Sequence, residues 1–235
     1  RILRAVRYEQ RYEFALGERT HNLLLAALPM LQRISGDRVR HEMDKIFAEA
    51  KAIETMDRLQ ELGILKTIHP DMIWDSWVRN YISIIENPPP FWDIDSDIKS
   101  IPVKLILSYT IWFMRLPLHR AKSVTKRLRL PAIIAKNVME ASSLWEKSST
   151  LINTKPHVIT ALLNKVPNLA IYAVYSTCSQ EEIKTILLTY IREWKYVTPK
   201  TNGHDLEARQ IPPGPIYNKI LSRLRDAWLD TEILI

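Results

Sequence analysis

Apolar residues recur every three or four positions along almost the whole chain, which is the spacing of one face of an α-helix. No sustained alternation of apolar and polar residues, which would indicate a strand, interrupts this pattern. Only 5 glycines but 14 prolines occur, as expected of helices separated by short loops. The predicted fold class is therefore all-α, without any β-sheet. The expected helices lie near residues 1–12, 18–32, 37–50, 52–63, 71–86, 100–116, 120–129, 131–148, 156–165, 167–177, 179–195 and 215–229.

Two interruptions divide this series of helices. The proline-rich run 87–90 ends one predicted helix and leads into the acidic stretch 93–97. Turn-forming residues gather again over 198–203. Both interruptions predict seams between packed groups of helices.

The composition narrows the class of protein. With 46% hydrophobic residues the chain can bury a core, and its net charge of +7 indicates an anionic partner. Nucleic acid is the commonest such partner, with a membrane surface or an acidic protein as alternatives. No apolar run approaches the roughly 20 residues of a membrane span. Nucleic acid is the predicted partner, and no membrane is. The single cysteine, Cys178, excludes a disulfide framework and a multi-cysteine zinc site, and fits a reducing cytoplasm.

The positive charge is unevenly distributed. No Asp or Glu occurs from Ile98 to Met139, although lysines and arginines are frequent there. Such residues bind nucleic-acid phosphates by displacing counterions, whatever the base. The alternative is a solvated surface that happens to be basic. The predicted RNA contacts in this stretch are Lys122, Lys126, Arg127 and Arg129.

Four arginines lie at helical spacing at the start of the chain. Arg1, Arg4, Arg7 and Arg11 share one helix face, since 3.6 residues complete a turn. Four guanidinium groups on one face repel each other unless phosphates or carboxylates neutralise them. The stripe therefore predicts either a nucleotide or RNA site, or ion pairs with acidic residues of this chain or of a neighbouring domain.

The first eleven residues, Arg-Ile-Leu-Arg-Ala-Val-Arg-Tyr-Glu-Gln-Arg, resemble a segment of the class II tRNA nucleotidyltransferases and bacterial poly(A) polymerases. In that family the segment commonly reads Glu-Asp-Pro-x-Arg-(Ile/Leu)-Leu-Arg-Ala-x-Arg-Phe, with Arg1 on its first arginine and Tyr8 in place of phenylalanine. The resemblance implies that Arg1, with an Asp that would precede it, selects the base of incoming ATP or CTP. Arg4 and Arg38 are predicted to bind the nucleotide with it.

Residues 34–42, Ile-Ser-Gly-Asp-Arg-Val-Arg-His-Glu, resemble the next family motif, commonly Ile-Ser-x-Glu-Arg-(Ile/Val)-x-x-Glu. Local chemistry predicts that the side chain of Ser35 or Asp37 caps this helix. It also predicts an ion pair between Arg38 and Glu42, which lie one turn apart. The resemblance implies that this helix supports the one that selects the nucleotide.

Residues 59–65 and 68–70, Leu-Gln-Glu-Leu-Gly-Ile-Leu and Ile-His-Pro, match the family's exit from the same region. Gly63 is predicted to end a helix in the left-handed conformation. His69 is interpreted as a loop residue rather than a catalytic base, because a lone histidine before a proline more often belongs to a loop.

A third match lies near the end of the chain. Residues 203–206 and 211–217 resemble a family tail that commonly reads Gly-x-Asp-Leu and then Gly-Ile-Pro-Pro-Gly-Pro-x-Tyr-Gly-x-Ile-Leu. Pro215 is predicted in the first turn of a helix, where its missing N–H costs nothing. Gly214 is predicted to allow a close backbone approach, and Asp205 to cap the short helix that follows it. The predicted RNA contacts of the last helix are Lys219 and Arg223.

These matches jointly imply an elongated helical array with a neck at residues 1–70, a body at 71–198 and a tail at 199–235. The parent enzyme would transfer AMP or CMP from ATP or CTP to the 3′ end of tRNA or another RNA. Its magnesium would be held by carboxylates of an N-terminal catalytic head in the same chain. Because residue 1 already lies in a helical pattern, the chain is interpreted as the remainder of a longer cytoplasmic protein. Alone it is expected to bind RNA without catalysis and to hold no metal or cofactor.

Two alternatives remain open from the sequence: a non-catalytic helical RNA-binding domain, and a helical scaffold for an acidic protein. Three other features are interpreted as structural. The pair His204-Asp205 lacks the further ligands of a metal-dependent phosphohydrolase. Cys178 is expected to be a small buried side chain. The aromatic residues Tyr109, Trp112 and Trp145 are expected in the core rather than stacked on bases.

Overall fold

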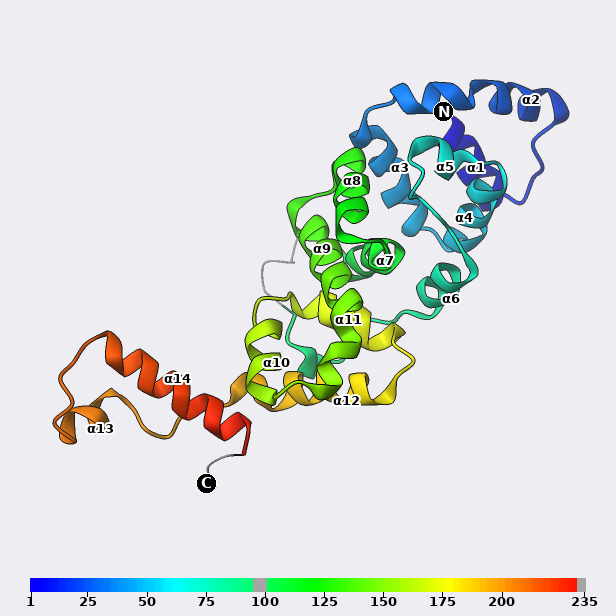
Figure 1. Cartoon of the computed structure of the whole chain (residues 1–235). Coiled ribbons are helices and arrows are strands. Elements are labelled where there is room, and N and C mark those ends of the chain that lie inside the picture. Colours follow the sequence, from blue (N-terminus) through cyan, green and yellow to red (C-terminus); the bar gives the residue numbers. More distant parts are fainter. Residues whose placement is uncertain (95–100, 232–235) are drawn as a thin grey trace.

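The computed structural model describes residues 1–94 and 101–231, and every regular element in these ranges is a helix. The predicted all-α class is confirmed for this part of the chain. The acidic residues Asp95 and Asp97 and the basic residue Lys99 lie outside the described residues. The helices form an elongated array with an N-terminal bundle at one end, a central bundle, and a C-terminal arm that projects from the other end (Figure 1).

Five short α-helices and a 3-10 helix make up the N-terminal bundle. Gly63 adopts φ +68, as predicted, and its left-handed backbone separates α4 from a five-residue helix that the sequence did not predict. Val6, Met43 and Leu59 are fully buried where α1, α3 and α4 meet. The elements are α1 (Ile2–Arg11), α2 (Glu18–Ala27), η1 (Leu28–Arg33), α3 (Gly36–Phe47), α4 (Ala52–Glu61) and α5 (Ile64–Ile68).

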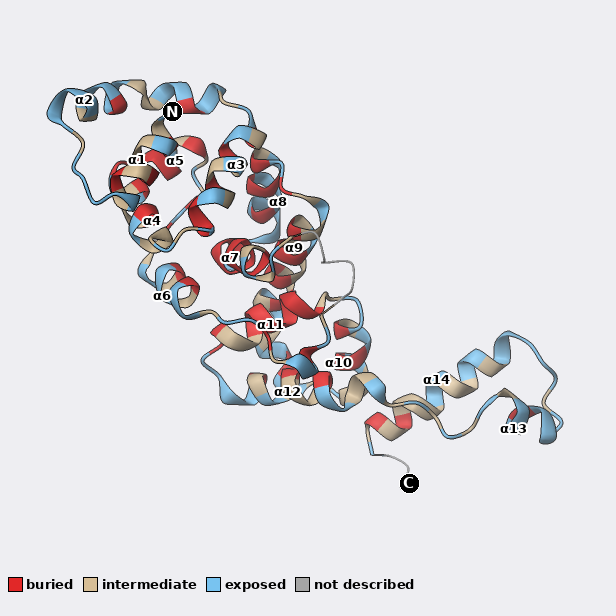
Figure 2. Cartoon of the chain, turned by 180° about the vertical axis from the view of Figure 1, so that it is seen from behind, coloured by how far each residue is buried: buried red, intermediate tan, exposed pale blue. Residues whose placement is uncertain are grey.

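The central bundle surrounds α7, whose residues from Ile106 to Phe113 are all buried (Figure 2). Tyr109 and Trp112 belong to this core, as predicted, and the Trp112 indole donates a hydrogen bond to the Ile73 carbonyl at 2.8 Å. The bundle contains α6 (Ser76–Ile84), η2 (Pro90–Trp92), α7 (Val103–Phe113), α8 (Leu118–Leu128), α9 (Ala132–Lys147), η4 (Ser148–Asn153), α10 (Pro156–Leu163), α11 (Asn168–Thr177), α12 (Glu181–Arg192) and η5 (Trp194–Tyr196).

The C-terminal arm consists of α13 (Gly203–Ala208) and α14 (Pro215–Leu229). Asn202 caps α13, and the side chain of Asp205 completes a capping box by accepting from the Asn202 N–H at 2.8 Å. Pro215 begins α14, as predicted. The prediction of a close approach at Gly214 is wrong, because a Cβ there would meet no atom within 4 Å.

The close backbone approach occurs instead at Gly36, where the N-terminal bundle meets α8. A Cβ on Gly36 would lie 2.1 Å from the Arg127 carbonyl oxygen, a distance that real Cβ contacts do not show. Arg127 also donates to the Leu31 carbonyl at 3.1 Å, and the Tyr109 hydroxyl donates to Asp44 at 2.8 Å. These contacts fix the orientation of the two bundles.

Replacing Gly36 with alanine is expected to destabilise the chain by about 1–3 kcal/mol, because backbone must move to relieve the overlap. At this chain length the melting temperature should fall by roughly 2–4 °C per kcal/mol in a thermal unfolding experiment. Gly203→Ala is the matched control, since Gly203 also begins a helix and its Cβ would lie 3.6 Å from Tyr217. Equal melting temperatures for the two variants would show that the contact between Gly36 and the Arg127 backbone tolerates a side chain.

Candidate nucleic-acid interface

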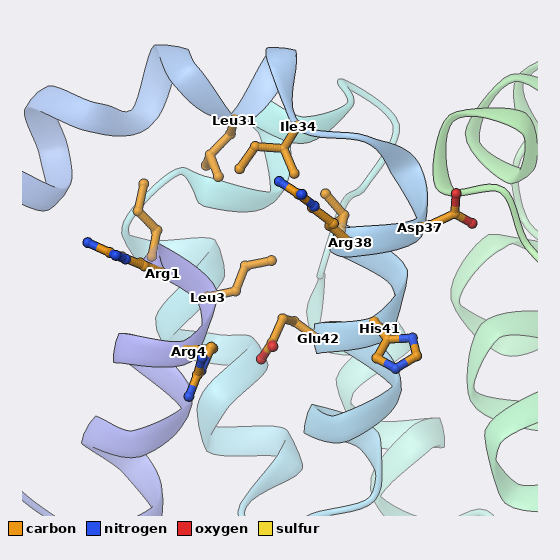
Figure 3. A pocket seen from close by; sticks show the side chains of 11 residues that line it. Arg1, Leu3, Arg4, Leu31, Ile34, Asp37, Arg38, His41 and Glu42 are labelled. Atoms are coloured by element: carbon orange, nitrogen blue, oxygen red, sulfur yellow. The ribbon is translucent and has the colours of Figure 1, made fainter.

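A cavity of about 430 Å³ opens between α1, α3 and η1. Its apolar surface comes from side chains such as Leu3, Leu31 and Ile34. Arg1, Arg4 and Arg38 all line it, so two motifs that are far apart in the sequence contribute to one site. Arg38 points from α3 into the space beside α1, whereas Arg1 and Arg4 project from α1 at its rim (Figure 3). Its volume and mixed lining suit a small molecule with apolar and anionic parts.

The arginine stripe of α1 divides into two pairs with different surroundings. Arg1 and Arg4 are exposed at the cavity and form no ion pair within the described residues. Arg7 is buried and donates to Glu49 at 2.6 Å and to Glu42 at 3.4 Å. Arg11 lies 3.7 Å from the same Glu49 but is half exposed. The ion-pair interpretation therefore holds for Arg7 and Arg11, and the nucleotide or RNA interpretation stays a prediction for Arg1 and Arg4.

Arg7 forms ion pairs with two carboxylates, and one of them, Glu42, lines the cavity. Burial lowers the pKa of Arg7, but the hydrogen bond and charge of Glu49 and the charge of Glu42 outweigh it, so the pKa is raised. Arg7 also stacks over the Tyr8 ring at 4.7 Å. Hydrogen bonds from Arg4 and Arg7 lower the pKa of Tyr8. The pairing orients Glu42, whose side chain points toward α1 (Figure 3).

Two local predictions for α3 are wrong. Ser35 is the N-cap residue, but no side chain caps this helix, and Asp37 instead bonds Arg129 at 2.8 Å. Glu42 pairs with Arg7 and Lys45 rather than with Arg38. Arg38 thus stays exposed at the cavity. His41 also lines the cavity, and only its place in the second motif indicated it.

The predicted RNA contacts of the basic stretch differ in their availability. Lys122 and Lys126 are exposed on α8 and form no ion pair within the described residues. Arg127 donates to the Leu31 carbonyl, and Arg129 bonds Asp37 across the joint between the bundles. The two lysines are therefore free to meet an anion, whereas the two arginines already join α8 to the N-terminal bundle.

The other predicted contacts lie on the projecting arm. Lys219 and Arg223 are exposed one turn apart on α14. The arm is held by Asp230, whose side chain is 3% exposed and accepts from the backbone N–H of His157 at 3.1 Å. The His157 ring and Lys155 contact the same carboxylate at 2.7 and 3.5 Å. This carboxylate at the end of α14 therefore caps the start of α10 and attaches the arm to the central bundle.

The attachment of the arm is expected to weaken in acid. Burial raises the pKa of Asp230, but the hydrogen bonds from His157 and Lys155 outweigh it, so the pKa lies below its usual value. A carboxylate with a lowered pKa stabilises the fold fully above its unfolded pKa, near about 4, and loses that effect as pH falls further. The protection of α14 amides from hydrogen exchange, corrected for the intrinsic exchange rate at each pH, should therefore fall below about pH 4 in the wild type. In Asp230→Asn exchange should be fast already at neutral pH, and an unchanged neutral rate would contradict the attachment.

The remaining candidate chemistry is structural. The backbone N–H of Asp71 donates to Nδ1 of His69, so Nε2 carries the proton and donates to the Ser123 hydroxyl at 3.0 Å. This tautomer cannot take a proton from Ser123. Burial lowers the pKa of His69 and keeps the ring neutral. Cys178 is buried, as predicted.

Residues 1–94 and 101–231 contain no group of three or more His, Cys, Asp or Glu that could hold a metal ion. No single helix in the same ranges is long and apolar enough to cross a membrane. The helices α10 and α11 pass that test only as a pair, and they are bent by 119°.

Known proteins share this architecture. A family described as "Probable RNA and SrmB-binding site of polymerase A" matches residues 13–74. The A-adding tRNA nucleotidyltransferase of Geobacter sulfurreducens is 23% identical over 99% of this chain and 27% of its own length. The CCA-adding enzyme of Thermotoga maritima, solved in complex with tRNA, has a TM-score of 0.66 and 20% identity over 100% of this chain and 57% of its own. A CCA-adding enzyme in complex with ATP also has a TM-score of 0.66, with 21% identity over 97% of this chain and 55% of its own.

The fold is that of the helical part of CCA-adding enzymes, and residues 13–74 resemble an RNA-binding site of polymerase A. The predicted resemblance is confirmed: the chain is related to the class II tRNA nucleotidyltransferases and bacterial poly(A) polymerases. It spans about a quarter to three-fifths of the length of the relatives it matches.

Proposed function

We propose that the chain is the RNA-binding and nucleotide-selecting part of a template-independent RNA nucleotidyltransferase. This enzyme would add AMP or CMP to the 3′ end of tRNA or another RNA in the cytoplasm. The observation that carries the proposal is that Arg1, Arg4 and Arg38 line one cavity at the meeting of two family motifs. Its apolar surface suits the base and ribose of ATP or CTP, and guanidinium groups suit the phosphates or the base edge.

The proposed division of labour follows the length of the array. A neck at residues 1–70 would select the nucleotide, and a body at 71–198 and a tail at 199–235 would hold the RNA. The catalytic head would be a separate domain of the same chain. It would hold the magnesium and the reacting phosphates of the nucleoside triphosphate. The exposed cations on α8 and α14 support the RNA-binding role, because phosphate contacts supply most non-specific RNA affinity.

Reversing the charge of both Lys122 and Lys126 to glutamate is expected to weaken tRNA binding at least about thirtyfold near 0.1 M salt, since each phosphate contact contributes about 0.7–0.9 to the salt slope. The plot of log affinity against log salt concentration, measured by fluorescence anisotropy, should become shallower by about 1.5. The control reverses Lys51 and Lys184, which have carboxylate partners and change the net charge equally. Identical slopes for both double variants would assign α8 to an ordinary solvated surface.

A further inference from the structure

A second cationic cavity lies in the central bundle, far along the array from the cavity of the three arginines. It has a volume of about 240 Å³ and is formed by α9, the α10–α11 loop, α12 and η5. Lysines reach it from three of these elements, and no carboxylate lines it. The three are Lys136, Lys165 and Lys195.

The lysines of this cavity are poorly neutralised. Lys195 bonds the exposed Asp93 at 3.1 Å. Neither Lys136 nor Lys165 forms an ion pair or hydrogen bond within the described residues. Three ammonium groups around one hollow repel each other, and a bound anion would remove that repulsion.

A hydrogen-bond donor is also fixed in this cavity. The Tyr190 hydroxyl lies 3.0 Å from Oδ1 of Asn164 and donates to it. Burial raises the pKa of Tyr190 to about 12, so the hydroxyl stays protonated. With its oxygen used in this way, the Asn164 side chain offers its amide nitrogen, which has no acceptor among the described residues. Lysines and an amide N–H are the donors that phosphate oxygens accept from.

We propose that the cavity of Lys136, Lys165 and Lys195 binds a phosphate group of the RNA backbone. This inference rests on the proposed function, and it adds a contact point in the body. The elements that form the cavity lie between the N-terminal bundle and the projecting arm (Figure 1). An RNA strand that contacts both the bundle and the arm would therefore pass this part of the molecule. A phosphodiester group fits a cavity of about 240 Å³.

The test compares the wild type with the Lys136→Gln/Lys165→Gln double variant in tRNA binding between about 0.05 and 0.3 M salt. Loss of this one phosphate contact should make the salt slope shallower by about 0.7–0.9 and lower affinity about sixfold near 0.1 M. Lys184→Gln is the control, because Lys184 lies on α12 but pairs with Glu181 at 2.8 Å outside the cavity. It should change affinity less than twofold and leave the slope unchanged.

Three outcomes overturn the inference in different ways. If the wild type does not bind RNA, the proposed function fails with it. If the wild type binds RNA and the double variant keeps its affinity and slope, only the cavity assignment fails. Calorimetric titration with inorganic phosphate separates the two sources of a phosphate group. Heat that disappears in the double variant while RNA affinity is unchanged assigns the cavity to free phosphate.

Discussion

Replacing Arg1 with alanine, in the proposed parent enzyme, is expected to reduce discrimination among nucleoside triphosphates about ten- to a hundredfold. A charge-assisted hydrogen bond of this kind contributes about 1.5–3 kcal/mol, and a tenfold change corresponds to about 1.4 kcal/mol. Arg1 lies exposed at the rim of the cavity, so no fold contact is lost with it. Affinity for RNA should stay nearly unchanged. The measurement is nucleotide incorporation with each triphosphate supplied alone, with RNA binding followed in parallel.

Arg11→Ala provides the matched control for this experiment. Arg11 belongs to the same helix and the same stripe, but it does not line the cavity. Arg1→Lys should restore little of the discrimination among nucleoside triphosphates, because an ammonium group cannot reproduce the planar pair of donors of a guanidinium. If discrimination survives in Arg1→Ala and only RNA affinity falls, Arg1 binds phosphate and the proposed alignment of the first motif is wrong.

Replacing Arg7 with methionine should have the largest effect on stability. The Arg7 side chain is 7% exposed between Glu42 and Glu49, which are each 17% exposed. Removing the cation leaves two largely buried carboxylates without their partner, and breaking a buried pair in this way costs about 3–5 kcal/mol. At roughly 2–4 °C per kcal/mol, thermal unfolding followed by circular dichroism should show a melting temperature about 10 °C lower.

Arg11→Met separates the buried ion pair from a general effect of removing positive charge. Arg11 reaches the same Glu49 at 3.7 Å but is 52% exposed, and surface ion pairs contribute little. Its loss should cost less than about 1 kcal/mol. A second variant, Arg7→Met/Glu49→Gln, should recover part of the loss because it removes one unpaired carboxylate. Equal melting temperatures for Arg7→Met and Arg11→Met would contradict the anchoring role.

The helices and several of their ends could be predicted from the sequence because the signals are local. Hydrophobic spacing indicated the all-α class, and the left-handed turn at Gly63 followed from glycine's freedom at positive φ. Pro215 began a helix because its missing N–H is not needed there. The five-residue α5 was missed, since so short a segment shows too little periodicity to be distinguished from the end of α4.

The ion pairs could not be predicted because they depend on tertiary packing. Arg38 and Glu42 lie at a spacing that permits a pair, yet Glu42 faces α1 and pairs with the buried Arg7. The same limit applies where α8 meets the N-terminal bundle. Arg127 and Arg129 were predicted as RNA contacts, but in the folded chain they bond Leu31 and Asp37. The resemblance to family motifs predicted more of the candidate site than residue spacing did. It assigned two separate segments to one nucleotide site, and the fold brings both segments to one cavity.

Binding of tRNA by the chain itself tests the proposal that it is the RNA-binding part of a nucleotidyltransferase. The measurement is the dissociation constant for tRNA from about 0.05 to 0.3 M salt, beside an acidic polypeptide of equal charge as the comparison. We expect saturable tRNA binding, with a logarithm of the association constant that falls linearly with the logarithm of the salt concentration, and much weaker binding of the polypeptide. Binding of the acidic polypeptide as tight as that of tRNA, or no tRNA binding at low salt, would contradict it.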